Sequence, residues 1–130
     1  LMSGKNLAAG EAGIIITDST SSPMRLGVTG KSIASCGFCP MVSRIGHTDL
    51  FGKPLKQTRI NMADALAASA VLVMGESDEQ TPIAIIEDVP FVEFSDHAPT
   101  AEQLKAWSVE MEDDLYASFL MRMDWRKGQK

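Results

Sequence analysis

The chain has 130 residues, of which 45% are hydrophobic and 22% charged, and its formal net charge is −5. This composition predicts one globular domain of ordinary size and excludes a disordered chain. The negative charge argues against a nucleic-acid partner, and no apolar run is long enough to span a membrane. The first residues lack a signal-peptide pattern, so we expect a cytoplasmic protein.

The first strand is predicted at Ile14–Thr17, where successive β-branched residues indicate a short buried segment. An irregular start, residues 1–12, precedes it. Oxygen-bearing side chains fill residues 17–22, and Pro23 ends the stretch. These groups fit either a polar turn or a site for a hard cation or a phosphate. Arg25 fits either a phosphate contact or an ordinary surface ion pair.

Residues 28–36 have strand character, and a short strand is expected within 41–45. Between them, Cys36 and Cys39 form a Cys-x-x-Cys pattern. The pattern lacks partner ligands at a zinc-finger spacing and does not open a helix, so a buried turn fits it better than a zinc site or a redox pair. His47, in a loop, fits either a general base or a simple hydrogen-bonding residue.

The clearest helix is predicted over residues 61–74. Asn61 can cap its N-terminus, Asp64 places negative charge in the first turn, and Gly75 follows its end. Its apolar residues lie nearly all round, which is typical of a buried helix. An acidic loop then leads to a second buried strand, expected at residues 83–87.

A boundary is expected near residues 95–99, which separates a main part, 1–95, from a helical appendage, 96–130. Thr100 and Gln103 form a capping box. The residues that follow predict an amphipathic helix, or two short ones broken near Ser108. Apolar side chains recur there at three- and four-residue steps, at Leu104, Trp107, Met111, Leu115 and Phe119. The basic end, 122–130, is expected to fray.

Three acidic stretches adjoin the predicted buried elements: Asp18–Ser19, Asp49 and residues 76–79. Hard divalent ions such as Mg²⁺ or Mn²⁺ take oxygen ligands from separate parts of a chain. If these stretches converge, they form a metal site that could bridge the phosphates of a nucleotide. The sequence contains no Walker-type loop and no Gly-x-Gly-x-x-Gly motif.

Several separated motifs over residues 13–87 occur in the order typical of one enzyme family. They are Ile-Ile-Thr-Asp18-Ser19, Pro23-Met-Arg25-Leu-Gly27, Gly46-His-Thr-Asp49-Leu-Phe-Gly52, Ala63-Asp64-Ala-Leu-Ala-Ala68, Met74-Gly75-Glu76 and Pro82-Ile-Ala-Ile-Ile86. In this respect the chain resembles the γ-glutamyl ligases of the deazaflavin coenzyme F420. Its tail is similar to a bacterial branch labelled as folate γ-glutamate ligases.

The resemblance implies an enzyme that joins L-glutamate to a carboxylate acceptor, either an F420 precursor or a folate-like molecule. It implies GTP as co-substrate, Mn²⁺ or Mg²⁺ as cofactor with K⁺ as a further candidate, and an acyl phosphate intermediate. Metal ions suit this chemistry because they neutralise charge on a transferring phosphoryl group. The family also implies a homodimer.

Carried over by motif, Asp18 would ligate one metal ion, and Ser19 and Glu76 a second. No catalytic residue is assigned, and Asp49 is expected to have a structural or substrate-side role. The residues expected to contact the nucleotide are Arg25, Met74, Gly75, Glu76, Ser77, Asp78, Glu79, Gln80 and Thr81.

The expected fold is α+β and γ-glutamyl-ligase-like: a mixed or antiparallel sheet around strands 14–17 and 83–87, packed on a buried helix, with a helical C-terminal tail. Family members are longer and begin with a lysine-bearing nucleotide segment and an Asn-Ala-Gly-Ile-Asp-like metal motif. We therefore expect this chain to be the C-terminal part of a ligase, with a separate N-terminal chain as one option.

The alternative is a non-catalytic half-domain that binds a partner chain or a metabolite. A thiol-redox protein that acts through Cys36 and Cys39 is a third, weaker hypothesis. Both cysteines and residues 20–22 depart from the family pattern, which leaves the acceptor open.

Overall fold

The computed structural model describes residues 11–124, so most of the predicted irregular start and basic end lie outside it. The described chain contains two antiparallel two-stranded sheets and three helices. β1 (Ile14–Ser21) pairs with β2 (Val28–Cys36), and β3 (Met41–Ser43) pairs with β4 (Arg59–Asn61). The helices are α1 (Met62–Met74), α2 (Ala101–Trp107) and α3 (Ala117–Leu120). This arrangement confirms the α+β class and antiparallel pairing.

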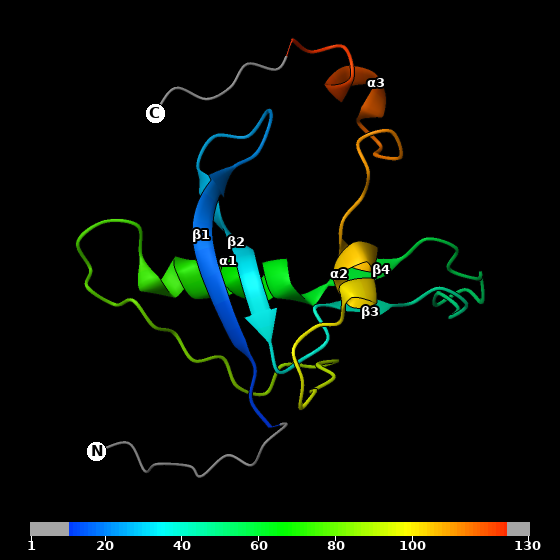
Figure 1. The fold of residues 1–130 in the computed structure, drawn as a ribbon. Helices are drawn as coiled ribbons and strands as arrows, with labels where there is room; N and C mark the ends of the chain where they lie inside the picture. Colours follow the sequence, from blue (N-terminus) through cyan, green and yellow to red (C-terminus); the bar gives the residue numbers. More distant parts are fainter. Residues whose placement is uncertain (1–10, 125–130) are drawn as a thin grey trace.

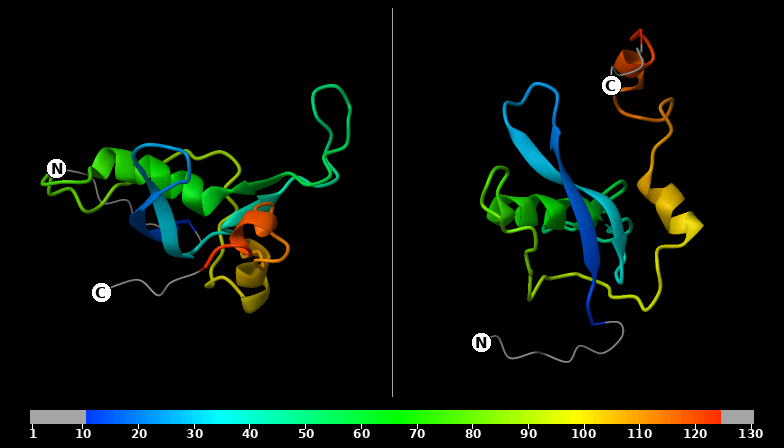
Figure 2. Two further views of the ribbon diagram at one scale, coloured as in Figure 1. Left: turned by 90° about the horizontal axis from the view of Figure 1, so that it is seen from above. Right: turned by 60° about the vertical axis from the view of Figure 1, so that its left-hand side comes forward.

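The β1–β2 hairpin lies across α1, and the β3–β4 ribbon extends beyond the helix (Figure 1). The hairpin pairs Ile14 with Cys36 at one end and Ser21 with Val28 at the other, with a register shift after Ile16. Figure 2 shows the same crossing from two further directions. The helix therefore covers one face of the hairpin.

β1 is longer and more exposed than predicted. It continues through the oxygen-rich residues to Ser21, so these residues form part of a strand and not a turn. Ile14 and Ile16 are 66% and 60% exposed, while Ile15 between them is partly buried and packs against the core. The expectation of a buried strand was wrong because side chains alternate between two faces and no second layer covers the outer face within residues 11–124.

α1 forms where the sequence predicted it. The Asn61 side chain accepts a hydrogen bond from the Asp64 backbone N–H at 3.1 Å, and Gly75 ends the helix with a φ of 82°. Ala63 and Ala67 are buried, whereas Leu72 is 85% exposed. The helix is thus buried along one side and not all round, because only the hairpin and the small core cover it.

A close approach joins β2 to α1 at Gly30. A Cβ atom at this position would lie against the Ala67 carbonyl oxygen and 2.6 Å from Cγ2 of Val71. Only glycine leaves room for the helix backbone at that distance. The small residues of α1 and this glycine together fix how closely the hairpin packs on the helix.

The strand expected at residues 83–87 is absent from the described chain. This segment carries no regular structure, and Ile83 and Ile85 are 81% and 72% exposed. The prediction failed because a strand needs a neighbour for its backbone hydrogen bonds, and no other described segment takes that place. Further along, Phe94 forms an isolated antiparallel bridge with Phe38.

The core is small and lies where β3, β4 and the start of α1 meet. Phe38, Val42, Met62 and Ala63 form it, and Trp107 from α2 packs against it. α2 and α3 confirm the two short helices predicted with a break near Ser108, and the capping box at Thr100 is present. None of the helices in residues 11–124 has the length and apolar character that crossing a membrane requires.

Candidate functional site

Asp18 and Ser19 sit in the second half of β1, opposite Lys31 and Gly30 of β2. Successive strand residues project to opposite faces, whereas residues paired across the sheet share a face. Ser19 therefore shares the α1 side of the hairpin with Gly30. Both residues are exposed, and Oδ1 of Asp18 accepts the backbone N–H of Ser19 at 2.8 Å.

The loop after α1 folds back on the end of the helix. The Thr81 hydroxyl donates to the Met74 carbonyl at 2.5 Å, which closes the loop. Inside it, the carboxylate of Glu79 accepts the Ser77 backbone N–H at 2.8 Å. This bond, together with the backbone N–H of Glu79 itself, lowers the pKa of the Glu79 carboxyl below its ordinary value. The loop is thus held by its own polar groups.

A pocket of about 360 Å³ lies inside this loop. Apart from Pro82, every residue lining it was predicted to contact the nucleotide, whereas Glu76 and Asp78 are exposed and lie outside the lining. Arg25 lies away from it, in the connection between β1 and β2. The lining residues are Met74, Gly75, Ser77, Glu79, Gln80, Thr81 and Pro82.

Packing relates Ser19 to the loop after α1. Gly30, opposite Ser19 in the sheet, packs on Val71, and the Val71 carbonyl accepts the backbone N–H of Gly75 at 2.9 Å. Ser19 is thus connected through Gly30 and Val71 to the end of α1, where the loop that contains Glu76 begins. Ser19 therefore lies on the part of the hairpin that packs against Ala67 and Val71 of α1, and Glu76 follows the end of the same helix.

Asp49 has a different position and a structural role. Its Oδ1 accepts the backbone N–H groups of Phe51 and Lys53 at 2.9 and 2.8 Å, which shapes the turn between β3 and β4. Figures 1 and 2 show this turn and the loop after Met74 extending from opposite ends of α1. The three acidic stretches therefore do not converge within the chain.

The available donors suit a hard cation in kind but not in number. Asp18, Ser19 and Glu76 offer the oxygen atoms that Mg²⁺ and Mn²⁺ prefer. Across residues 11–124, however, no group of three or more His, Cys, Asp or Glu side chains gathers closely enough to hold a metal ion. A metal ion bound by these residues would need protein ligands from outside residues 11–124.

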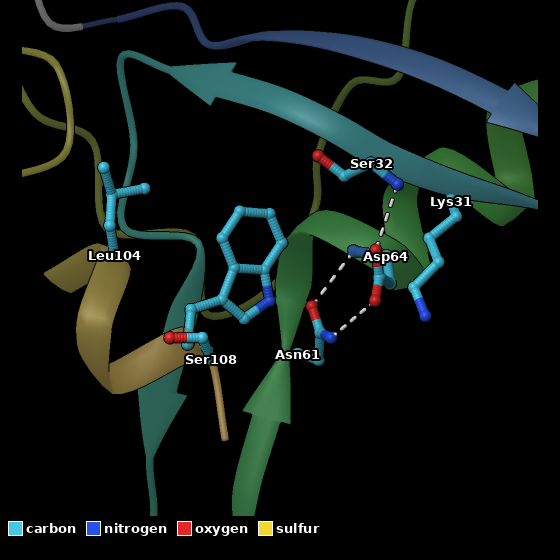
Figure 3. A pocket seen from close by; sticks show the side chains of 7 residues that line it. Lys31, Ser32, Asn61, Asp64, Leu104 and Ser108 are labelled. Atoms are coloured by element: carbon cyan, nitrogen blue, oxygen red, sulfur yellow. Dashed lines mark hydrogen bonds between the residues drawn. The ribbon is translucent and has the colours of Figure 1, made fainter. Parts of the chain in front are cut away.

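A second pocket, of about 380 Å³, lies between β2, the start of α1 and α2 (Figure 3). Asp64 connects two of these elements, because its Oδ1 accepts the Ser32 backbone N–H at 3.0 Å and its Oδ2 accepts Nδ2 of Asn61 at 2.7 Å. The sequence identified Asp64 only as a first-turn acid. Its bond to Ser32 spans 32 positions, and no local pattern signals such a contact.

The Cys-x-x-Cys pattern forms a turn between β2 and β3. Both cysteines are free; Cys36 is exposed and Cys39 half-buried. The Sγ atom of Cys39 accepts a hydrogen bond from Nε2 of Gln103 at 3.5 Å, so the turn contacts α2. His47 is exposed in the β3–β4 connection.

The structure is that of an α+β protein in which an antiparallel hairpin packs across a helix. Residues 5–88 match the F420-0:Gamma-glutamyl ligase family. The chain therefore belongs to this family, as its motifs predicted.

Curated relatives support the same assignment. The chain is 46% identical to a coenzyme F420:L-glutamate ligase of Methanococcus maripaludis over 80 residues, which is 62% of this chain and 32% of that protein. It is 43% identical to the enzyme of the same name from Methanocaldococcus jannaschii over 89 residues, 67% of this chain and 36% of the relative. The chain thus spans about a third of the length of these relatives.

Proposed function

We propose that the complete protein is a γ-glutamyl ligase that forms an amide between L-glutamate and a carboxylate acceptor. The observation that carries this proposal is the family match over residues 5–88. An F420 precursor is the first candidate acceptor, because the curated relatives are named for that coenzyme. A folate-like carboxylate is the second candidate.

The proposed reaction uses GTP to activate the acceptor. A carboxylate is a poor electrophile, so transfer of the γ-phosphoryl group to one of its oxygens creates an acyl phosphate. The glutamate amine then attacks the acyl carbon and displaces inorganic phosphate, which leaves the amide and GDP. This order accounts for the need for a nucleoside triphosphate in amide formation.

We infer that the pocket within residues 74–82 contributes to nucleotide binding. Apart from Pro82, its lining lies within the segment predicted from the motifs, and its loop is pre-organised by the Ser77–Glu79 and Thr81–Met74 hydrogen bonds. Asp18, Ser19 and Glu76 would supply part of a Mg²⁺ or Mn²⁺ site. The rest of the γ-glutamyl-ligase-like fold would supply the remaining ligands.

Ligand-dependent thermal stability tests these assignments. Because a ligand that binds only the native state stabilises it, Mn²⁺ with GDP should raise the melting temperature of the complete protein by several degrees. Asp18→Ala and Glu76→Ala should each abolish most of that rise, whereas Asp113→Ala, in the exposed acidic tail, should retain it. An unchanged rise in both site variants would remove these residues from the metal site.

Product analysis tests the reaction and the acceptor. The complete protein, incubated with L-glutamate, GTP and Mn²⁺, should add glutamate to one of the two acceptor classes, detected by mass spectrometry. Release of GDP should depend on that acceptor. Absence of a glutamylated product with both classes would favour the non-catalytic half-domain.

The exposed apolar residues favour association with further polypeptide. Ile14, Ile16 and Ile33 of the hairpin are exposed, as are Leu72 and Val73 of α1. Exposed apolar patches of this kind mark interaction surfaces in native proteins. We propose that a second copy of the chain covers them in a homodimer, and a separate N-terminal chain is the alternative occupant.

A further inference from the structure

We propose that the pocket between β2, the start of α1 and α2 binds a planar aromatic carboxylate. The pocket is lined by Lys31, Ser32, Asn61, Asp64, Leu104, Trp107 and Ser108. It shares no lining residue with the pocket at residues 74–82. Its volume, about 380 Å³, lies within the range usual for small-molecule sites.

The polar wall of the pocket offers one cationic group for an anion. Asp64 and Asn61 are engaged with each other, and Asp64 also holds the Ser32 backbone N–H. Lys31 lies on the same wall as Asp64 (Figure 3) and forms no ion pair with any residue in 11–124. Its ammonium group is therefore available to a ligand, and an ammonium–carboxylate contact is among the stronger hydrogen bonds.

The opposite wall is apolar and aromatic. Leu104 and Trp107 come from α2, and Trp107 also packs against the core cluster described above. The core contact fixes the indole, so a ligand would not have to order it on binding. A flat ring placed against an indole gains stacking energy in addition to burial of apolar area.

The charge balance selects the class of anion. Asp64 lines the pocket together with Lys31, so its negative charge would repel a phosphate dianion more strongly than a carboxylate. The first backbone N–H groups of α1 are also partly occupied, since Met62 and Ala63 donate to the Pro40 carbonyl and Asp64 to Asn61. A singly charged aromatic acid fits these walls better than a phosphate.

The pocket is built from residues inside the family match and from residues that lie beyond it. Lys31, Ser32, Asn61 and Asp64 lie within the matched residues 5–88, whereas α2 follows them. The capping box at Thr100 and the contact of Gln103 with Cys39 position α2 at the pocket. The aromatic wall is thus a feature that the tail adds to the family domain.

NMR spectroscopy of the complete protein tests the proposal without nucleotide, metal or glutamate. The indole N–H signal of Trp107, identified by its absence from the spectrum of Trp107→Phe, serves as a local reporter. We expect 2-naphthoate to shift this signal in a saturable manner. The matched uncharged probe, 2-naphthylmethanol, should bind about tenfold more weakly because it lacks the carboxylate that Lys31 recognises.

Variants separate the two walls of the pocket. Lys31→Ala should reduce naphthoate affinity about tenfold to the level of the alcohol, and Lys31→Arg should restore it. Lys53→Ala, in the distant β3–β4 connection, serves as the matched control and should not change affinity. Leu104→Ser should weaken both probes while the amide spectrum stays that of the folded protein.

Two results would overturn the proposal: equal binding of naphthoate by Lys31→Ala and the parent protein, or naphthoate shifts confined to signals outside the pocket. Neither result bears on the ligase proposal, because the assay contains no reaction component. Conversely, a protein without ligase activity that still binds naphthoate through Lys31 would retain this site.

Discussion

At the scale of single residues, Asp64 connects more of the structure than its place in the sequence suggests. One carboxylate receives hydrogen bonds from the Ser32 backbone and the Asn61 side chain, and its own N–H is capped by Asn61. The residue therefore combines helix capping with attachment of β2 to α1. Its backbone partner in β2 would lose an acceptor if the carboxylate were removed.

Replacing this carboxylate should destabilise the fold. Asp64→Ala should lower the free energy of unfolding by about 1–3 kcal/mol, because it leaves the Ser32 N–H without its acceptor and removes a favourable charge from the first turn. Urea denaturation followed by circular dichroism measures the change. Asp113→Ala, on the exposed tail, should stay within about 0.5 kcal/mol of the parent protein. Equal stability of both variants would contradict the proposed link.

The lowered pKa of Glu79 should make the stability of the loop after α1 depend on pH. Its pKa is lowered because the carboxylate accepts the Ser77 N–H, so the charged form is the one that supports the folded loop. This contribution is present above the ordinary glutamate pKa and is lost as the pH falls through the lowered value. The Ser77 amide signal in NMR spectra should titrate at that lower pH, and Glu79→Gln should abolish the titration. A Ser77 midpoint at the ordinary glutamate value would contradict this reading.

At the scale of elements, the crossing of the hairpin over α1 depends on the absence of a side chain at Gly30. The helix backbone at Ala67 and the Val71 side chain occupy the space that a Cβ would need. The same contact sets the position of β1, and so of Asp18 and Ser19, relative to the end of the helix. The packing of two elements thus determines the geometry of the candidate site.

Gly30→Ala should therefore weaken the hairpin–helix contact. Because the neighbouring atom at Ala67 is backbone and cannot rotate away, we expect overpacking that costs about 1–3 kcal/mol of unfolding free energy. Denaturant midpoints measure this cost. Thr29→Ser, at the adjacent exposed position of β2, should be nearly neutral. A midpoint unchanged by Gly30→Ala would show that the helix and hairpin can separate freely.

At the scale of the whole molecule, the described chain buries few large side chains and leaves many exposed. The core cluster contains Phe38, Val42, Met62 and Ala63, while three isoleucines of the hairpin (14, 16 and 33) and those of segment 83–86 are exposed. A chain that spans about a third of its relatives' length would share its core with other parts of the family fold. The homodimer proposal applies to these same surfaces.

The proposed homodimer should be detectable by its mass, and its interface should include the hairpin. Light scattering of the complete protein should give twice the mass of one copy if two copies pair. Ile16→Asp with Ile33→Asp should shift the protein to the monomer, because charges would then lie in the buried interface. Leu50→Asp, at a more exposed position in the β3–β4 connection, should leave the mass unchanged. A monomer at every concentration would exclude the homodimer and favour a separate partner chain.

The sequence by itself determined the features of this protein that depend on residues close together in the chain. The N-cap at Asn61, the glycine that ends α1, the capping box at Thr100 and the ordered family motifs were all readable, because the interacting groups lie within a few positions of one another. The family match confirmed the family that the motifs predicted. The residues that line the pocket at 74–82 also come from one short segment of the chain.

Only the tertiary structure decided what depends on distant neighbours. Apolar runs at residues 14–17 and 83–87 look alike in sequence, yet only the first found a partner strand, and β1 extended through the oxygen-rich residues because β2 supplies pairing as far as Ser21. The separation of Asp49 from Glu76 and the bond from Asp64 to Ser32 likewise follow from packing. Strand pairing and burial require two segments to meet, and a pattern within one segment does not encode the other.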